Sequence, residues 1–365
     1  MASGRRILIV DIEPPRPDRD SGSVRCQNLM RLLVSLGYAV TLHCEGRMPA
    51  RDEIDELRAL GIDTSPYAGS DPRWLSENPD DYCATIVCRY HLGLAWLPLL
   101  RRMLPHCLHI LDTVDLHHLR ELREAELRSN KGLRAAAVAT RRRELKAIQL
   151  ADVSWVVSIA ERNYLQKLAP GTCIEVIPNL HAMPEDVTPF AGRRGFIFVG
   201  GGRHPPNLDA ADWLLRDIFP MIRSRLGDVQ LHMVGPGLAE ALRIDPHAYP
   251  GVIFHGHVPS LVSLLSSCRV SLAPLRFGAG VKGKVSEALA HGLPVVTTPS
   301  GAEGMHLRPG LDALICTDAT MIAEAAVRVH EDPELWHRLS DNGRQIVLRH
   351  FSLQSTREKL STLLP

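Results

Sequence analysis

Short apolar runs alternate with helical patterns along the whole chain. The run Arg5–Asp11 predicts a buried strand, and apolar residues at helical spacing in Val24–Leu36 predict the helix that follows it. Further strands are predicted at Ala39–Cys44, Ala84–Arg89, Cys107–Asp112, Val153–Ser158, Cys173–Pro178, Phe196–Gly200, Val229–Gly235, Val252–Gly256, Val270–Leu275, Val295–Thr298 and Ala313–Asp318, and further helices at Asp52–Leu60, His91–Met103, Leu119–Ile148, Pro206–Arg225, Met321–His330, Pro333–His350 and Phe351–Leu364. The alternation predicts an α/β protein with parallel sheets that helices cover on both faces.

A polar, proline-containing segment, His181–Arg194, interrupts this alternation and predicts a linker between two domains. At 365 residues the chain is long for one domain and sufficient for two. We therefore expect one domain at 1–188, a second at 189–350, and a terminal helix at 351–365.

Charge and cysteine usage limit the possible partners. The net charge of +1 gives no argument for nucleic acid. The eight cysteines include no CxxC pair and no cluster with histidine at zinc spacing, which is typical of reduced thiols in a cytoplasm. The run Ile7–Val10 is too short for the core of a signal peptide, and no stretch reaches the roughly 20 apolar residues of a spanning helix. We expect a cytoplasmic protein whose membrane association, if any, is peripheral.

The segment Phe277–Glu303 (FGAGVKGKVSEALAHGLPVVTTPSGAE) carries the strongest chemical signal. Its order is glycine-rich loop, helix and buried strand, and glycines before a helix let backbone amides approach an anion. Lys282 and Lys284 add positive charge beside Gly280 and Gly283, so we expect this segment to bind a phosphate group. Glu287, about one turn into the helix, is placed to accept hydrogen bonds from ligand hydroxyls. The alternative is an ordinary glycine-rich turn with solvated lysines.

A second group of polar residues follows the strand predicted at Cys107–Asp112. Asp112, Asp115 and His117 lie at or just past this strand end, where ligands bind in parallel sheets, and they are candidates for binding sugar hydroxyls or transferring protons. Asp112 is the preferred candidate, because Asp115 also suits the N-cap of the following helix.

The predicted helix Leu119–Ile148, with a possible break near 130–132, is basic and amphipathic. It has nine basic and four acidic residues, a balance of +5 in a nearly neutral chain. Such a helix can lie on an anionic bilayer, or it can be a solvated face with ordinary ion pairs.

The spacing Gly-x-Lys-Gly-Lys-x-x-Glu-Ala-x-x-x-Gly-x-Pro-Val-Val-x-Thr, from Gly280 to Thr298, resembles the donor-binding signature of retaining glycosyltransferases of family 4. The resemblance implies the GT-B fold, in which two Rossmann-like domains face each other across a cleft and a C-terminal helix crosses back to the first domain. It also implies transfer of a sugar, with retention, from a nucleotide-sugar donor to a glycan or lipid-linked acceptor, in synthesis of surface polysaccharide or glycoconjugates.

The resemblance also suggests roles for single residues. Lys282, Lys284, Arg203 and the amides near Gly280 and Gly283 would hold the diphosphate without a metal ion or other cofactor, and Glu287 would hold the ribose. Three further positions match the family less closely: Gly22 would face the donor from the first domain, His257 would lie beside the base, and Asp112 takes the place of a family histidine.

One departure from the family pattern keeps other functions open. The usual glutamate eight residues before Glu287, which contacts the donor sugar, is Ala279 here. A nucleotide-sugar 2-epimerase shares the fold and is one alternative. The other is a non-catalytic GT-B protein that binds a nucleotide sugar or a partner.

Overall fold

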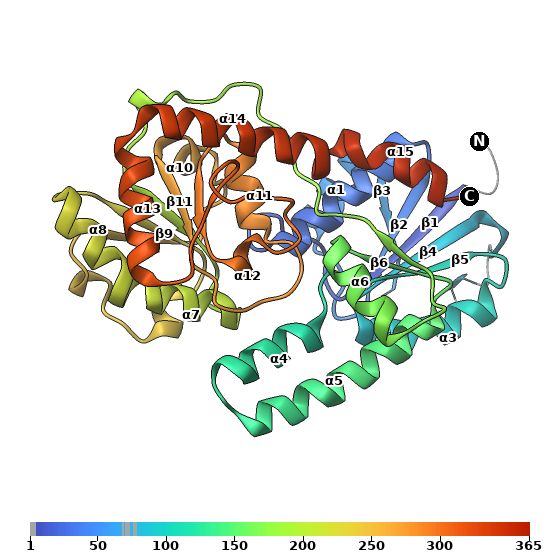
Figure 1. Cartoon of the computed structure of the whole chain (residues 1–365). Helices are drawn as coiled ribbons and strands as arrows, with labels where there is room; N and C mark the ends of the chain where they lie inside the picture. The colour runs from blue at the N-terminus through green and yellow to red at the C-terminus, as the bar shows by residue number, and fades with distance from the viewer. Residues whose placement is uncertain (1–4, 68, 70–73, 76–78) are drawn as a thin grey trace.

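The computed structural model describes residues 5–67, 69, 74, 75 and 79–365, which form two parallel sheets flanked by helices (Figure 1). The first sheet has the strand order β3-β2-β1-β4-β5-β6-β7 and the second has the order β10-β9-β8-β11-β12-β13. In each sheet the direction in which successive strands are added reverses beside the first strand, between β1 and β4 in the first sheet and between β8 and β11 in the second. The loops that follow these neighbouring strands therefore diverge at a switch point. Ligands of doubly wound sheets bind at such points.

The N-terminal domain contains seven parallel strands and six helices in the described part of the chain. The strands are β1 (Arg6–Asp11), β2 (Ala39–Cys44), β3 (Ile62–Thr64), β4 (Tyr82–Cys88), β5 (Leu108–Asp112), β6 (Val153–Val156) and β7 (Ile174–Val176). The helices are α1 (Ser21–Ser35), α2 (Arg51–Ala59), α3 (Tyr90–Met103), α4 (His117–Leu127), α5 (Lys131–Leu150) and α6 (Ile159–Leu168).

The C-terminal domain repeats this arrangement. Its strands are β8 (Phe196–Val199), β9 (Leu231–Val234), β10 (Val252–Gly256), β11 (Val270–Ala273), β12 (Val295–Thr297) and β13 (Leu314–Ile315). Its helices are α7 (Pro205–Trp213), a π-helical turn at Leu214–Ile218, α8 (Phe219–Leu226), α9 (Leu238–Leu242), α10 (Val262–Ser267), α11 (Gly283–Ala290), α12 (Pro299–Ala302), α13 (Ala319–Glu331) and α14 (Pro333–His350).

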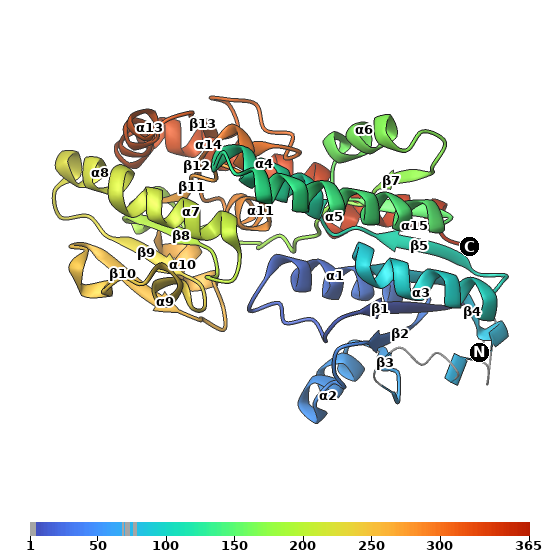
Figure 2. The ribbon, with the colours of Figure 1, turned by 90° about the horizontal axis from the view of Figure 1, so that it is seen from below.

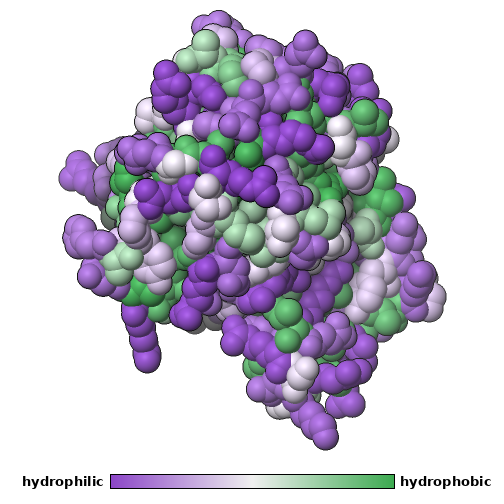
Figure 3. Space-filling model, turned by 60° about the vertical axis from the view of Figure 1, so that its left-hand side comes forward, coloured by the Kyte–Doolittle hydropathy of each residue, from purple (hydrophilic) through white to green (hydrophobic). Residues whose placement is uncertain are grey.

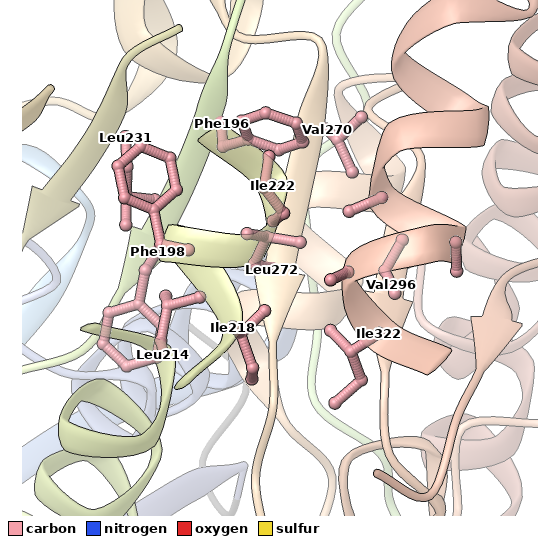
Figure 4. Close-up of a cluster of buried hydrophobic side chains, with 14 of the residues drawn as sticks. Phe196, Phe198, Leu214, Ile218, Ile222, Leu231, Val270, Leu272, Val296 and Ile322 are labelled. Atoms are coloured by element: carbon pink, nitrogen blue, oxygen red, sulfur yellow. The ribbon is translucent and has the colours of Figure 1, made fainter. Parts of the chain in front are cut away.

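Continuous apolar runs become strands because both faces of each sheet are covered. In β1 every residue from Ile7 to Val10 is fully buried, and alternate side chains enter the two cores on opposite faces of the sheet. In the second sheet, Phe196 and Phe198 of β8 lie on one face and pack with Leu214, Ile218 and Ile222 of the covering helices (Figure 4).

The last helix returns to the N-terminal domain. From α14 the chain continues into α15 (Leu353–Leu363), which lies beside α1 in the other domain (Figure 1). Leu360 and Leu364 are buried in the N-terminal core, and Arg357 donates hydrogen bonds to Ser35 at the end of α1. The predicted α/β fold, with its two Rossmann-like domains and crossing helix, is therefore confirmed.

The basic segment 119–148 forms two helices rather than one. The break falls at 128–130, where Ser129 has a φ of 50° and the side chain of Asn130 caps α5 by accepting a hydrogen bond from the Leu133 amide. In Figure 1 the resulting α4–α5 hairpin extends along the lower edge of the molecule, and in Figure 2, seen from below, the hairpin lies in front.

The sequence pattern missed β3, α6 and the short helices α9, α10 and α12, and it placed several strand ends one to three residues too far out. β3 has only three residues, which is too few for a periodic signal. The strand predicted at Ala313–Asp318 shortens to β13 (Leu314–Ile315), because only these residues pair with β12.

In the described part of the chain, no helix combines the length and hydropathy needed to span a membrane. The face shown in Figure 3 is mostly hydrophilic, and its hydrophobic residues form small separate groups.

Candidate functional site

The N-termini of two helices, one from each domain, meet at the boundary between the domains. α1 begins at Ser21 and α11 begins at Gly283, and a Cβ atom built on Gly283 would lie 2.5 Å from the Cβ of Ser21. A side chain at position 283 would therefore force the helices apart. Both dipoles direct positive potential to this point. Asp20 already caps α1, whereas no described side chain caps α11, so the amides at the start of α11 are the ones left to bind an anion.

Lys282 is buried and Lys284 is half-buried at this helix start. The Nζ of Lys282 donates to the carbonyl oxygen of Gly280 at 2.6 Å, and the Nζ of Lys284 donates to Oδ1 of Asn207 on α7 at 2.5 Å. Burial lowers the pKa of Lys282 to about 8 and that of Lys284 to about 7. An anion placed beside them would favour their charged forms, so the pair is suited to binding phosphate groups.

Glu287 is half-buried one turn further along α11, and burial raises its pKa to about 7. Among the described residues, no group donates a hydrogen bond to its carboxylate or pairs with it. A half-buried acid without a partner, on the same helix as Lys284, is a candidate for binding a ligand.

Arg203 and His257 differ in their surroundings. Arg203 is exposed in the turn after β8, and no described acid pairs with it. His257 follows β10, and its Nε2 lies 2.6 Å from Oδ2 of Asp18 in the loop before α1. In this structure His257 therefore links the two domains.

Asp112 ends β5 as expected, but its carboxylate is occupied within the N-terminal domain. Arg25 on α1 donates to both oxygens at 3.0–3.2 Å, and the amide of Val114 donates to Oδ1 at 3.2 Å. The side chains of Asp112 and Arg25 are 3% and 1% exposed. Arg25 also donates to the carbonyl of Ile177, the residue that follows β7. The surroundings of Asp112 are those of a structural ion pair, and its catalytic role stays a prediction.

His117 begins α4 between two acids. Its Nδ1 lies 3.4 Å from Oδ1 of Asp115 and 3.5 Å from Oε1 of Glu144. Burial opposes the charged ring, but Glu144 and Asp115 outweigh it and raise the pKa of His117. Asp115 thus contacts both His117 and the glycine-rich loop.

Sequence reasoning missed the side chains by which the N-terminal domain holds the glycine-rich loop. Glu161 on α6 accepts a hydrogen bond from the amide of Gly280 at 3.0 Å. Arg123 on α4 donates to the carbonyl of Gly278 at 2.6 Å and forms a bidentate pair with Glu303. The pattern Ser158-x-x-Glu161 is typical of a helix N-terminus and was a signal for α6. Nothing local to Arg123 indicated its distant partners.

Gly22 lies in the first turn of α1, close to Arg89, a residue that the sequence analysis did not single out. A Cβ atom on Gly22 would lie 3.1 Å from Oδ1 of Asp20 and 3.4 Å from Nη2 of Arg89. Arg89 follows β4 with a φ of 67°, an unusual conformation for a residue with a side chain, and pairs with Asp11 at the end of β1. Strained residues of this kind gather at functional sites.

The site and fold can now be compared with known proteins. Residues 193–332 match the model of the family described as glycosyl transferases group 1. A Klebsiella pneumoniae protein, described as an uncharacterized 44.6 kDa protein in the cps region, is 28% identical over 135 residues. That alignment covers 35% of this chain and 35% of the Klebsiella protein, so it spans about a third of the curated relative.

Two solved structures resemble almost the whole chain. Sucrose-phosphate synthase from Thermosynechococcus elongatus has a TM-score of 0.72 at 16% identity, with 98% of both chains covered. The Anabaena protein HepE, in complex with UDP-glucose, has a TM-score of 0.69 at 13% identity, again with 98% of both chains covered. At these identities the likeness shows the fold.

The two facing Rossmann-like domains and the crossing helix define the chain as a protein of the GT-B fold. Its C-terminal domain, where α11, Lys282 and Lys284 lie, is the part that matches glycosyl transferases group 1. Together these findings support a glycosyltransferase of GT-B fold.

Proposed function

We propose that this protein transfers a sugar, with retention of configuration, from a nucleotide-sugar donor to a glycan or lipid-linked acceptor. The observation that carries the proposal is the meeting of α1 and α11 beside Lys282 and Lys284. A match of the C-terminal domain to glycosyl transferases group 1 supports it, as does the bound UDP-glucose of the similarly folded HepE. The cps-region relative favours a role in surface polysaccharide synthesis.

The proposed chemistry rests on the growth of negative charge on the leaving nucleotide diphosphate. Lys282, Lys284 and the amides at the start of α11 would stabilise that charge most strongly in the transition state, which accelerates the reaction. Arg203, exposed in the turn after β8, is available to the outer side of the diphosphate. Glu287 would accept hydrogen bonds from the ribose. No step in this scheme requires a divalent ion, and the described residues contain no cluster suited to one.

The proposal is tested in two stages. Nucleotide diphosphates and nucleotide sugars are first screened for an increase in melting temperature, because a ligand of the folded state stabilises it by mass action. The binding donor is then incubated with glycan and lipid-linked acceptors in EDTA, and NMR identifies the product and its anomeric configuration. Transfer with retention in EDTA is the expected result. The proposal fails if no donor binds, or if a bound donor is never transferred.

The same assay separates the two alternatives. Change of the donor sugar without any acceptor would identify a nucleotide-sugar 2-epimerase. Donor binding with neither transfer nor epimerisation would identify a non-catalytic protein, an alternative that Ala279 keeps open. For this reason the assay includes reactions without acceptor.

We further propose that the protein acts on the cytoplasmic face of an anionic membrane, to which α5 docks. Six basic residues of α5 have no acid partner among the described residues: Lys131, Arg134, Arg141, Arg142, Arg143 and Lys146. The acid of this helix, Glu144, is buried against His117 and His118. All eight cysteines are free, which suits a reducing compartment.

Docking is measured by co-sedimentation with phosphatidylcholine vesicles that contain or lack phosphatidylglycerol. Binding should require the anionic lipid and weaken with added salt. The double change Arg141→Ala and Arg142→Ala should reduce it, whereas the matched control Arg216→Ala and Arg225→Ala, on exposed positions of the other domain, should not. Equal sedimentation with both kinds of vesicle would contradict the proposal.

A further inference from the structure

We propose that Asp115 is the carboxylate by which the N-terminal domain binds the sugar of the donor. This inference rests on the proposed function and assigns a residue to the sugar end of the same site. The glycine-rich loop itself offers no acid there, because the residue before Gly280 is Ala279. Asp115 reaches that place from the opposite domain.

The turn that carries Asp115 is tightly anchored and strained. Val114 has a φ of 64°, a left-handed conformation that is strained for a β-branched residue. Its amide donates to Asp112, the hydroxyl of Thr113 donates to the carbonyl of Trp155, and the amide of Asp115 donates to the carbonyl of Thr113. These bonds hold the backbone in a conformation that turns Asp115 toward the C-terminal domain. The buried pair of Asp112 with Arg25 thus fixes the base of this turn.

Asp115 lies directly against the glycine-rich loop. A Cβ atom built on Gly280 would lie 3.1 Å from the Cβ of Asp115, so the two backbones approach closely here. Gly280 also has a φ of 68°, a conformation that favours glycine. Burial lowers the pKa of Lys282 and of His204, and the charge of Asp115 acts in the opposite direction on both. The carboxylate therefore stands among groups of the donor-binding domain.

Of three carboxylates in this part of the N-terminal domain, Asp115 has capacity left for a ligand. Asp112 is occupied by Arg25, and Glu161 accepts from the amides of Leu116, Val157 and Gly280. Asp115 uses Oδ2 to bind Arg120. Among the described residues no group donates a hydrogen bond to its Oδ1, which lies 3.4 Å from Nδ1 of His117. Oδ1 can therefore accept hydrogen bonds from sugar hydroxyls.

If Asp115 binds the sugar, its substitution should have an effect on ligand binding that loss of a purely structural residue would not have. A group that contacts only the sugar adds to the affinity of the nucleotide sugar and not to that of the nucleotide diphosphate alone. Asp115→Asn should therefore weaken nucleotide-sugar binding roughly tenfold or more, as expected for loss of a charge-assisted hydrogen bond, without a comparable weakening of diphosphate binding. Transfer should fall with it.

The experiment begins with the wild-type protein and a panel of UDP-glucose, UDP-N-acetylglucosamine and GDP-mannose. The tightest ligand and its nucleoside diphosphate are then titrated by calorimetry into wild type, Asp115→Asn and the control Asp55→Asn, an exposed acid on α2. If wild type binds no nucleotide sugar, either in this panel or in the thermal screen above, the proposed function itself fails. A different result is that wild type and Asp115→Asn both bind the nucleotide sugar with the same preference over its nucleoside diphosphate. In that case only the Asp115 inference is overturned.

Two further variants separate ligand binding from folding. Asp115→Ser keeps a smaller polar group in place and allows the same comparison if Asp115→Asn does not fold. Equal weakening of diphosphate and nucleotide sugar in the folded variants would assign Asp115 to the structure of the loop and overturn the inference. Adding Ala279→Glu to Asp115→Asn returns a carboxylate to the neighbouring half-buried position, and we expect it to restore part of the preference for the nucleotide sugar.

Discussion

The change Asp112→Asn tests whether Asp112 is a structural or a catalytic acid. The substitution keeps the shape of the side chain but removes the charge that compensates Arg25. With 3% and 1% exposure, neither side chain of this pair has access to water that would replace the lost partner. Arg25 retains its hydrogen bonds to the carbonyls of Ile177 and Pro178, but its charge becomes unpaired inside the domain.

Removal of one member of a buried ion pair costs about 3–5 kcal/mol. For a domain of this size each kcal/mol lowers the melting temperature by about 2–4 °C, so Asp112→Asn should lower it by about 6–20 °C. The control is Asp55→Asn in the pair Asp55–Arg58, whose side chains are 60% and 72% exposed. That change should cost about 0.5 kcal/mol or less, or about 2 °C.

Differential scanning calorimetry of both variants, together with nucleotide binding at a temperature where both are folded, gives the comparison. We expect the large loss of stability only in Asp112→Asn, with nucleotide diphosphate affinity retained, because those contacts belong to the other domain. A melting temperature within about 2 °C of wild type, combined with loss of transfer, would refute the structural reasoning. It would instead support a catalytic role for Asp112 at the reacting sugar.

Three predictions concern the donor-binding domain. Lys282→Ala and Lys284→Ala should each weaken nucleotide diphosphate binding at least several-fold by calorimetry, since each removes a charge-assisted contact worth about 1.5–3 kcal/mol; wild-type affinity in both would place the phosphates elsewhere. Glu287→Gln should reduce transfer markedly with little change in melting temperature, and normal turnover would remove Glu287 from the site. Because burial holds the pKa of Lys282 at about 8 and of Lys284 at about 7, and a bound anion raises both, diphosphate binding should take up protons. Affinity should therefore be highest below about pH 7 and fall toward about pH 9, and a flat profile would contradict the assignment.

The sequence alone determined the architecture and singled out the glycine-rich loop. Apolar runs that are buried on both faces, as in β1, identify parallel strands, and the bounds of β2 and β10 were predicted to the residue. Gly280 and Gly283 were singled out for close approach to a phosphate. The structure adds a second reason for these glycines, because Asp115 and Ser21 of the other domain pack directly against them.

Only the tertiary structure decided which acid is enclosed in an ion pair and which lies against the glycine-rich loop. Asp112 and Asp115 are three residues apart after the same strand, and neither charge nor spacing shows which of them points outward. The answer depends on Arg25, 87 residues from Asp112, and on the conformation of Val114 between the two acids. The partner of Glu161 is Gly280, 119 residues away in the other domain. Such contacts arise from the packing of two domains, and local patterns of hydrophobic and polar residues do not encode them.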